Sequence, residues 1–234
     1  MEANEIFERI HKEYLDLVQK ASSLCFMSCK TSLQADCAAE IMKFIQTACV
    51  IEKKGFVSEQ RHDLAENVIV LQAQLSALVH ELGCLVCLKE ELAESAWDHL
   101  ILAENAVKVV ARLHGGAENQ FERLRHLQSI FFPAQTFMSA GIVIKKATCS
   151  ICSSNYENCS HILGKIYDGE LCHRIVEEVD LKEVSVLLEE EPYDRRCRIT
   201  HLSKAGIKTN LMTLETEPCE PSDGITISGY SIKY

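Results

Sequence analysis

Residues 149–173 read CSICSSNYENCSHILGKIYDGELCH, and this segment dictates how the C-terminal part of the chain folds. It holds four cysteines and two histidines within 25 residues. Thiolate and imidazole are ligands that zinc prefers, and two cysteines separated by two residues fold readily around one ion. Cys149 and Cys152 have this spacing, so they predict a metal site.

A tight turn at Asp168 and Gly169 brings further ligands to the same place. Asp-Gly is a strong signal for a two-residue hairpin turn, because both central residues then adopt positive φ. In such a hairpin Lys165 faces Cys172, and His161 at the hairpin's foot becomes the favoured fourth ligand. The predicted metal ligands are Cys149, Cys152, Cys172 and either Cys159 or His161.

A closed set of four protein ligands predicts a structural zinc ion. It leaves no coordination position for the water molecule that a catalytic zinc needs. Zinc also suits a mixed set of Cys and His better than iron does. The binding energy of the ion would help to fold a domain too small to stabilise itself. The alternative, ordinary buried thiols with a surface histidine, fits poorly with so dense a cluster.

The N-terminal part of the chain has the helical period. From residue 5 to about residue 132, apolar residues recur at spacings of three and four. The strongest run predicts a helix over 58–114, either continuous or broken near Gly83, where glycine weakens a helix by about 1 kcal/mol relative to alanine. Pro133 ends the last helix. Part of the run forms a coiled-coil seam: Leu64, Val68, Leu71, Leu75, Leu78, Leu82 and Leu85.

After Pro133 the helical period disappears, and short β-branched runs lie between Gly, Asp and Cys residues, which predicts strands. The runs are 141–144, 183–187, 197–200 and 225–228. The predicted fold class is α+β, with an N-terminal antiparallel helical bundle and a long coiled-coil-like helix, followed by a small mostly-β zinc-binding domain. We place these two domains at residues 1–133 and 134–234.

Composition and charge limit the classes of function. The 234 residues carry a formal net charge of -10, and the sequence pI is ≈ 5.4. Nucleic-acid binding is disfavoured, because phosphate contacts need clustered Lys and Arg. No apolar run approaches the roughly 18 to 20 residues of a membrane-spanning helix, and the N-terminus lacks the features of a signal peptide. The twelve cysteines, if kept reduced, favour a cytoplasmic protein.

The cysteine-rich segment and the strand after it resemble a module of tailed-phage proteins of the prohead-protease or capsid-associated type. The resemblance spans about residues 137–200 and depends on the cysteine spacing, the Asp-Gly turn and the stretch Leu181-Lys-Glu-Val-Ser-Val186. In the peptidase branch of that family the serine of a Glu-Val-Ser strand resembles the nucleophile, and Ser185 stands there. This chain departs from the family in lacking a comparable upstream histidine. On its residues alone, Ser185 is a polar residue of a half-buried strand.

Two functions follow as hypotheses. The leading one is a non-enzymatic interaction or assembly protein, whose helical domain forms a homo-oligomer or docks a protein partner. By analogy with the phage module, it is a capsid-associated protein or a defence component that senses phage proteins. The competing hypothesis is a hydrolase, either a prohead-protease-like serine peptidase using Ser185 or a zinc-dependent hydrolase. His99, beside Trp97 and Asp98, is interpreted as a helix-surface histidine.

Overall fold

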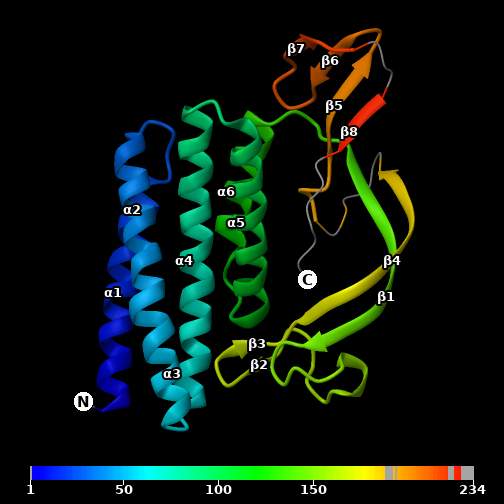
Figure 1. The fold of residues 1–234 in the computed structure, drawn as a ribbon. Helices are drawn as coiled ribbons and strands as arrows, with labels where there is room; N and C mark the ends of the chain where they lie inside the picture. The colour runs from blue at the N-terminus through cyan, green and yellow to red at the C-terminus, as the bar shows by residue number, and fades with distance from the viewer. Residues whose placement is uncertain (1, 188–191, 193, 221–223, 228–234) are drawn as a thin grey trace. The chain divides into compact units, whose positions relative to one another are not determined.

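The chain forms two compact units (Figure 1). The computed structural model describes residues 2–187, 192, 194–220 and 224–227. The helical unit comprises Met1–Ile130 with Ile166–Glu170, and the β unit comprises Phe131–Lys165 with Leu171–Tyr234. The predicted α+β class is confirmed, because helices come first and a mostly-β region with a cysteine cluster follows.

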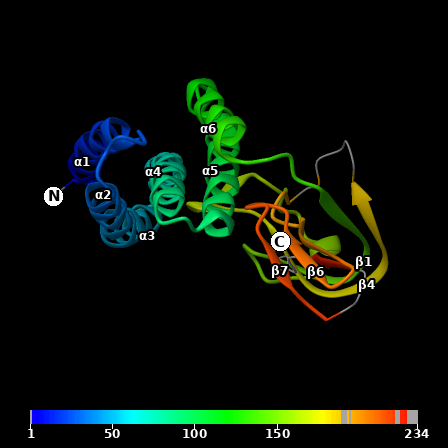
Figure 2. The same cartoon turned by 90° about the horizontal axis from the view of Figure 1, so that it is seen from above.

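The helical unit is built around one central helix. Its helices are α1 (Ala3–Leu24), α2 (Thr31–Phe44), the π-helical η1 (Ile45–Cys49), α3 (Val50–Ser58), α4 (His62–Lys89), α5 (Ala93–Leu113) and α6 (Glu118–Phe131). Helix α4 packs against α1, α2, α3 and α5. Seen from above, α4 lies between α2 and α5 (Figure 2). Each of these neighbours covers part of its apolar surface.

The predicted coiled-coil seam of α4 is used inside this unit. All of its seven residues, from Leu64 to Leu85, are at most 9% exposed. Buried residues outside the seam, such as Ala65 and Ile69, show that α4 is apolar on more than one side. A seam covered by the chain's own helices is not available to a second copy, so self-association has to use another surface.

The length and apolar composition of α4 raise the question of whether this helix spans a membrane. By length and composition it could span one, although the sequence predicted no segment of this kind. More than half of its most apolar window is buried inside the structure. A core helix with neighbours on several sides needs the same composition, and this accounts for the apolar residues of α4.

Residues 58–114 do not form one helix. Helix α3 ends at Ser58, and the chain turns at Gln60, which has a φ of 58°. A second turn follows α4, where Glu91 has a φ of 60°. The chain is therefore broken after Lys89 and not near Gly83, and α5 packs back along α4. Two left-handed residues, neither of them glycine, make these turns, and the apolar period gives no sign of them.

The β unit contains a long ribbon and a small sheet. Its elements are β1 (Phe137–Cys149), the 3-10 turn η2 (Tyr156–Asn158), β4 (Arg174–Leu187), β5 (Ile199–Lys204), β6 (Ile207–Asn210), β7 (Thr216–Pro218) and β8 (Gly224–Ile227). Strands β1 and β4 pair antiparallel as a two-stranded ribbon, and the other sheet has the order β7-β6-β5-β8. The predicted strand runs 141–144 and 183–187 lie within β1 and β4, and the run 225–228 lies on β8, except that Ser228 lies outside the described residues. Only the second half of the run 197–200 is in a strand, because β5 begins at Ile199.

The β1–β4 ribbon has two chemically different faces. Residues directly opposite each other in an antiparallel pair share a face, and successive residues alternate between faces. One face, here called the apolar ribbon face, pairs Met138 with Val186, Ala140 with Val184, Ile142 with Leu181, and Ile144 with Val179. The other face carries pairs such as Ser139 with Ser185 and Val143 with Asp180. The ribbon is therefore amphipathic along most of its length.

The predicted turn at Asp168 and Gly169 is confirmed. These residues have φ values of 49° and 70°, and they join β2 (Ile166–Tyr167) to β3 (Glu170–Leu171). The hairpin tip packs within the helical unit, where Lys53 Nζ lies 3.0 Å from Glu170 Oε1. Lys53 is only 8% exposed, so Glu170 supplies the counter-charge that a buried ammonium group needs.

Candidate metal centre

The cluster residues come from the end of β1, from the turn that follows it and from the loop after η2. Strand β1 ends at Cys149, and the chain then turns sharply, with Ser153 at a φ of 56°. The turn is closed by hydrogen bonds from the Cys149 N–H to the Ser154 carbonyl, 2.9 Å, and from the Ser153 N–H to the Cys149 carbonyl, 2.9 Å. This short turn presents both Cys149 and Cys152 to one point, as the spacing of two residues predicts.

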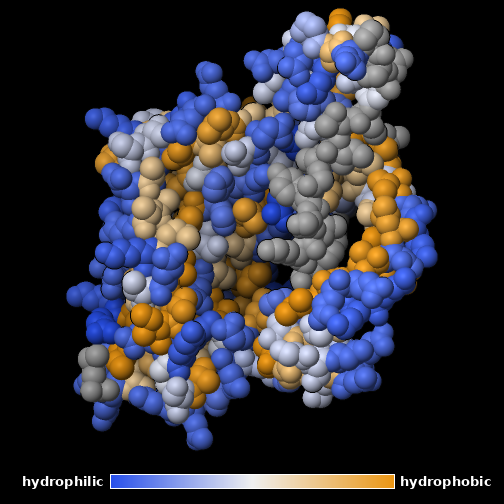
Figure 3. Space-filling view, in the orientation of Figure 1, coloured by the Kyte–Doolittle hydropathy of each residue, from blue (hydrophilic) through white to orange (hydrophobic). Residues whose placement is uncertain are grey.

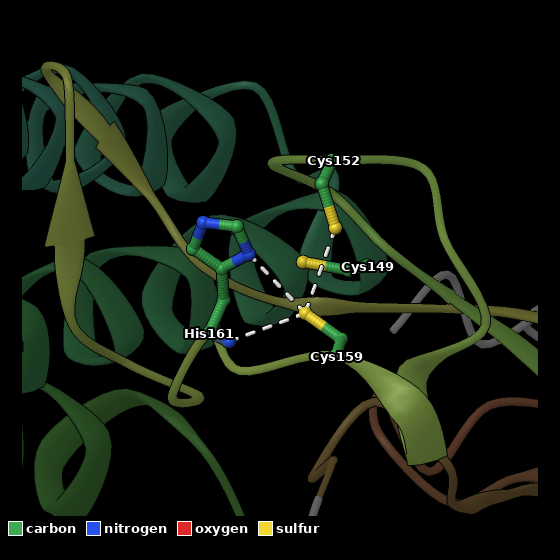
Figure 4. Close-up of side chains that lie close together, drawn as sticks. All are labelled: Cys149, Cys152, Cys159 and His161. Carbon is green, nitrogen blue, oxygen red and sulfur yellow. Dashed lines mark hydrogen bonds between the residues drawn. The ribbon is translucent and has the colours of Figure 1, made fainter.

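Four side chains meet at that point (Figure 4). The ligand atoms of Cys149, Cys152, Cys159 and His161 all lie within 4.8 Å of one another. The Sγ atoms of Cys152 and Cys159 are 3.5 Å apart. The Nδ1 atom of His161 is 3.2 Å from Cys159 Sγ. Both residues that the sequence offered as alternative fourth ligands are therefore in the cluster.

Cys172, which the sequence predicted as a ligand, is not one of these four residues but borders the cluster at Cys149. Its Sγ atom is 3.9 Å from that of Cys149, and its side chain is buried. The Cys172 N–H donates to the Lys165 carbonyl, 2.8 Å, and the Gly164 N–H donates to the Cys172 carbonyl, 2.8 Å. Lys165 thus faces Cys172, as the hairpin argument predicts. With Cys172 beside Cys149, five potential ligands are present, one more than a tetrahedral ion binds.

The spacing of the sulfur atoms fits a tetrahedral zinc ion. With zinc–sulfur bonds of about 2.3 Å, tetrahedral geometry puts two thiolates about 3.8 Å apart. The two sulfur pairs, Cys152 with Cys159 and Cys149 with Cys172, are separated by 3.5 Å and 3.9 Å, on either side of this value. The geometry and the types of donor atom are therefore both suited to a metal ion.

The electrostatics of the thiols also favour a cation. Burial acts to raise the pKa of Cys149, but the N–H groups of Cys152 and Ile151 and the neighbouring thiols lower it to about 7. Burial is the main reason that the pKa of Cys159 is raised to about 11, and the thiols of Cys149 and Cys152 add to it. Closely packed thiols cannot all lose their protons, because the resulting thiolates repel one another. A divalent cation at their centre compensates these negative charges.

His173, the second histidine of the segment 149–173, and Ser185 both lie outside the cluster. His173 is exposed, its N–H donates to Ser150 Oγ at 2.9 Å, and its Nδ1 lies 3.2 Å from the Leu171 carbonyl oxygen. Ser185 is also exposed and pairs with Ser139, near the opposite end of the ribbon from Cys149. Among the described residues, no histidine is hydrogen-bonded to Ser185.

One supporting contact has no signal in the sequence. The Arg174 guanidinium lies 4.6 Å from the ring centre of Tyr156, which fixes η2 against the start of β4. Arg174 is also the register partner of Cys149. A cation–π contact between an arginine and a tyrosine 18 positions earlier depends on strand register, which no local pattern reveals.

Comparison of the chain with protein-family models, with curated proteins and with solved structures finds no match. The resemblance to the phage module therefore stays an expectation from its residues. The case for a metal centre depends on the four clustered ligands and Cys172.

Proposed function

We propose that the protein is a non-enzymatic interaction or assembly protein that contains one structural Zn²⁺ ion. The observation that carries the metal part is the convergence of Cys149, Cys152, Cys159 and His161 within 4.8 Å, with Cys172 beside them. More protein ligands are present than a tetrahedral ion can bind, so none of its positions needs a water molecule. When bound, the ion contributes binding energy to the folding of the β unit.

The interaction part is supported by the apolar ribbon face. Leu181 is 62% exposed and Val184 is 50% exposed, although both belong to this face. Hydrophobic side chains gather along the ribbon in the space-filling view (Figure 3). A two-stranded ribbon is only marginally stable by itself, and a contiguous exposed apolar patch marks an interaction surface.

We propose a second copy of this chain as the occupant of that face. Strand β1 carries Lys145 and Lys146, whereas β4 has an acidic excess that includes Glu177, Glu178 and Asp180. A two-fold axis parallel to the strands stacks two ribbons so that β1 of one copy faces β4 of the other. The charges of Lys145 and Lys146 are already paired with Glu178, Asp180 and Glu177 of the same ribbon. The stacking is therefore favoured by burial of the two apolar ribbon faces against each other.

This dimer can be tested with one substitution and one matched control. We expect Leu181→Ser to shift the protein from dimer to monomer, measured by native mass spectrometry and by light scattering after gel filtration. Val143→Ser is the control, because Val143 has a similar exposure, 49%, but belongs to the opposite face. A wild-type protein that is monomeric at micromolar concentration, or a Leu181→Ser variant that stays dimeric, would contradict the proposal.

The cysteines also indicate a cellular setting. All twelve cysteines are free, which is expected in a reducing compartment, so we propose a cytoplasmic protein. A capsid-associated or anti-phage role is supported by the residue resemblance alone. Plating efficiency of phages on cells that carry the wild-type or the Cys149→Ser protein tests that role, and no difference for any phage would count against it.

The hydrolase alternative is tested at Ser185. We expect Ser185→Ala to leave the zinc content unchanged and the free energy of unfolding within about 0.5 kcal/mol, because the side chain is exposed. Thermal denaturation and elemental analysis measure both. Hydrolysis of a fluorogenic protein substrate by the wild type that is lost in a folded Ser185→Ala variant would overturn the non-enzymatic proposal.

A further inference from the structure

Two histidines of the helical unit face each other away from the cysteine cluster. His80 belongs to α4 and His99 to α5, and their Nδ1 atoms are 3.0 Å apart. Their ring centres are 5.2 Å apart, with the ring planes tilted by 46°. Both side chains are half-buried, so His99, which the sequence placed on a helix surface, is partly covered in the structure.

A glycine in α4 makes room for this contact. A Cβ atom at Gly83 would lie 2.7 Å from Nδ1 of His99, closer than real Cβ atoms come to a neighbour. Glycine weakens a helix relative to alanine, so helix stability does not account for Gly83. This glycine lets the His99 ring lie directly against α4. Neighbouring Trp97 and Leu100, both fully buried, fix the position of this turn of α5.

The two imidazoles are in a chemical state that suits metal binding. Burial, together with His99, lowers the pKa of His80 to about 4, and burial also lowers the pKa of His99. Both rings are therefore neutral at pH 7. A neutral imidazole can move its single proton to Nε2, which frees the Nδ1 lone pair for a metal without releasing a proton to solvent.

The distance between the rings also suits two adjacent ligands of one ion. Imidazole nitrogens bind zinc at about 2.0 to 2.1 Å, so two of them at neighbouring positions are roughly 3 Å apart. The observed separation of the Nδ1 atoms is 3.0 Å. Cys84, one helical turn from His80, does not compete as a thiolate, because burial raises its pKa to about 12.

We propose that His80 and His99 form a second metal site, which binds one divalent ion of the imidazole-preferring class through two Nδ1 atoms and completes its coordination with water. Nickel, copper and zinc belong to this class. The site lies entirely within the helical unit and shares no residue with the cysteine cluster. It depends in no way on the proposed interaction function.

The test uses full-length, untagged, zinc-loaded protein and nickel as the probe. We expect equilibrium dialysis at pH 7.5 to show one Ni²⁺ per chain while the zinc content stays constant. His80→Ala and His99→Ala are each expected to weaken nickel binding by roughly 10- to 100-fold or more. Loss of a group that only orients a metal ligand already costs this much, and loss of a ligand should cost at least as much. His126→Ala, which removes an exposed histidine of α6, is the matched control and should bind nickel like the wild type.

A second variant tests the geometry and keeps both imidazoles. Gly83→Ala should displace the His99 ring and weaken nickel binding, while circular dichroism shows the helices intact. The absorption spectrum separates the two sites, since nickel bound to thiolates has strong charge-transfer bands and nickel bound to imidazoles has only weak bands. Wild-type protein that takes up no nickel beyond zinc exchange, or uptake that is unchanged in the His80→Ala/His99→Ala protein, would overturn the proposal.

Discussion

Replacement of Cys149 by serine is expected to release the metal ion and to unfold the β unit. Cys149 is fully buried, contributes to the four-ligand cluster and lies 3.9 Å from Cys172, so its loss removes the thiolate between Cys172 and the rest of the cluster. Structural zinc contributes roughly 10 to 16 kcal/mol of apparent binding free energy in small zinc domains. Elemental analysis and thermal denaturation of the wild type and of Cys149→Ser measure both effects.

A cysteine outside the cluster provides the control for this experiment. Cys219 follows β7 and is half-buried, so Cys219→Ser removes one thiol without touching a proposed ligand. We expect the control to retain its zinc and its melting temperature. The structural-zinc proposal would fail if purified wild-type protein contained no stoichiometric metal and a strong chelator left its thermal stability unchanged.

The same assay identifies the remaining two ligands. Cys159, His161 and Cys172 compete for two positions once Cys149 and Cys152 have bound the ion. Substitution of each by serine or alanine should abolish tight binding in two variants and preserve it in the third. Replacement of zinc by cobalt reports the number of thiolates, because each sulfur ligand adds charge-transfer absorption.

The features that the sequence predicted correctly are local ones. The two-residue spacing of Cys149 and Cys152 and the dipeptide Asp168-Gly169 each determine the backbone over a few residues, and the structure has both turns. The helical period likewise predicts helices in the N-terminal part, since it depends on residues three and four positions apart.

The features that could not be predicted from the sequence depend on residues far apart in the chain. The apolar period of α4 predicts a seam but does not say whether the seam faces a second chain or, as observed, α1, α2 and α5. The turn at Glu91 has no glycine or proline to announce it. The contact of Arg174 with Tyr156 and that of His80 with His99 both depend on how elements pair, which spacing alone does not encode.

Replacement of Arg123 by methionine should be the most damaging change in the helical unit. Glu81 on α4 has a side chain that is 0% exposed, and Arg123 on α6 binds it through Nε and through Nη2, the latter at 2.8 Å from Oε2. Gln120 adds a donor at 3.3 Å. Removal of one partner of a buried pair leaves an uncompensated charge, which costs about 3 to 5 kcal/mol. Because Arg123 is itself 39% exposed, we expect the lower end of that range.

The comparison of three variants separates the buried charge from the loss of packing. Arg125→Met is the matched control on α6, since Arg125 is exposed and its guanidinium lies over the Phe121 ring, 4.5 Å from the ring centre. It should cost no more than about 1 kcal/mol. The Glu81→Leu/Arg123→Met protein should be more stable than Arg123→Met alone, because it has no buried carboxylate left to compensate. Urea denaturation followed by circular dichroism measures all three free energies of unfolding. If Arg123→Met costs no more than Arg125→Met, the carboxylate of Glu81 is reached by water, and α6 is held to α4 by apolar contacts instead of by this pair.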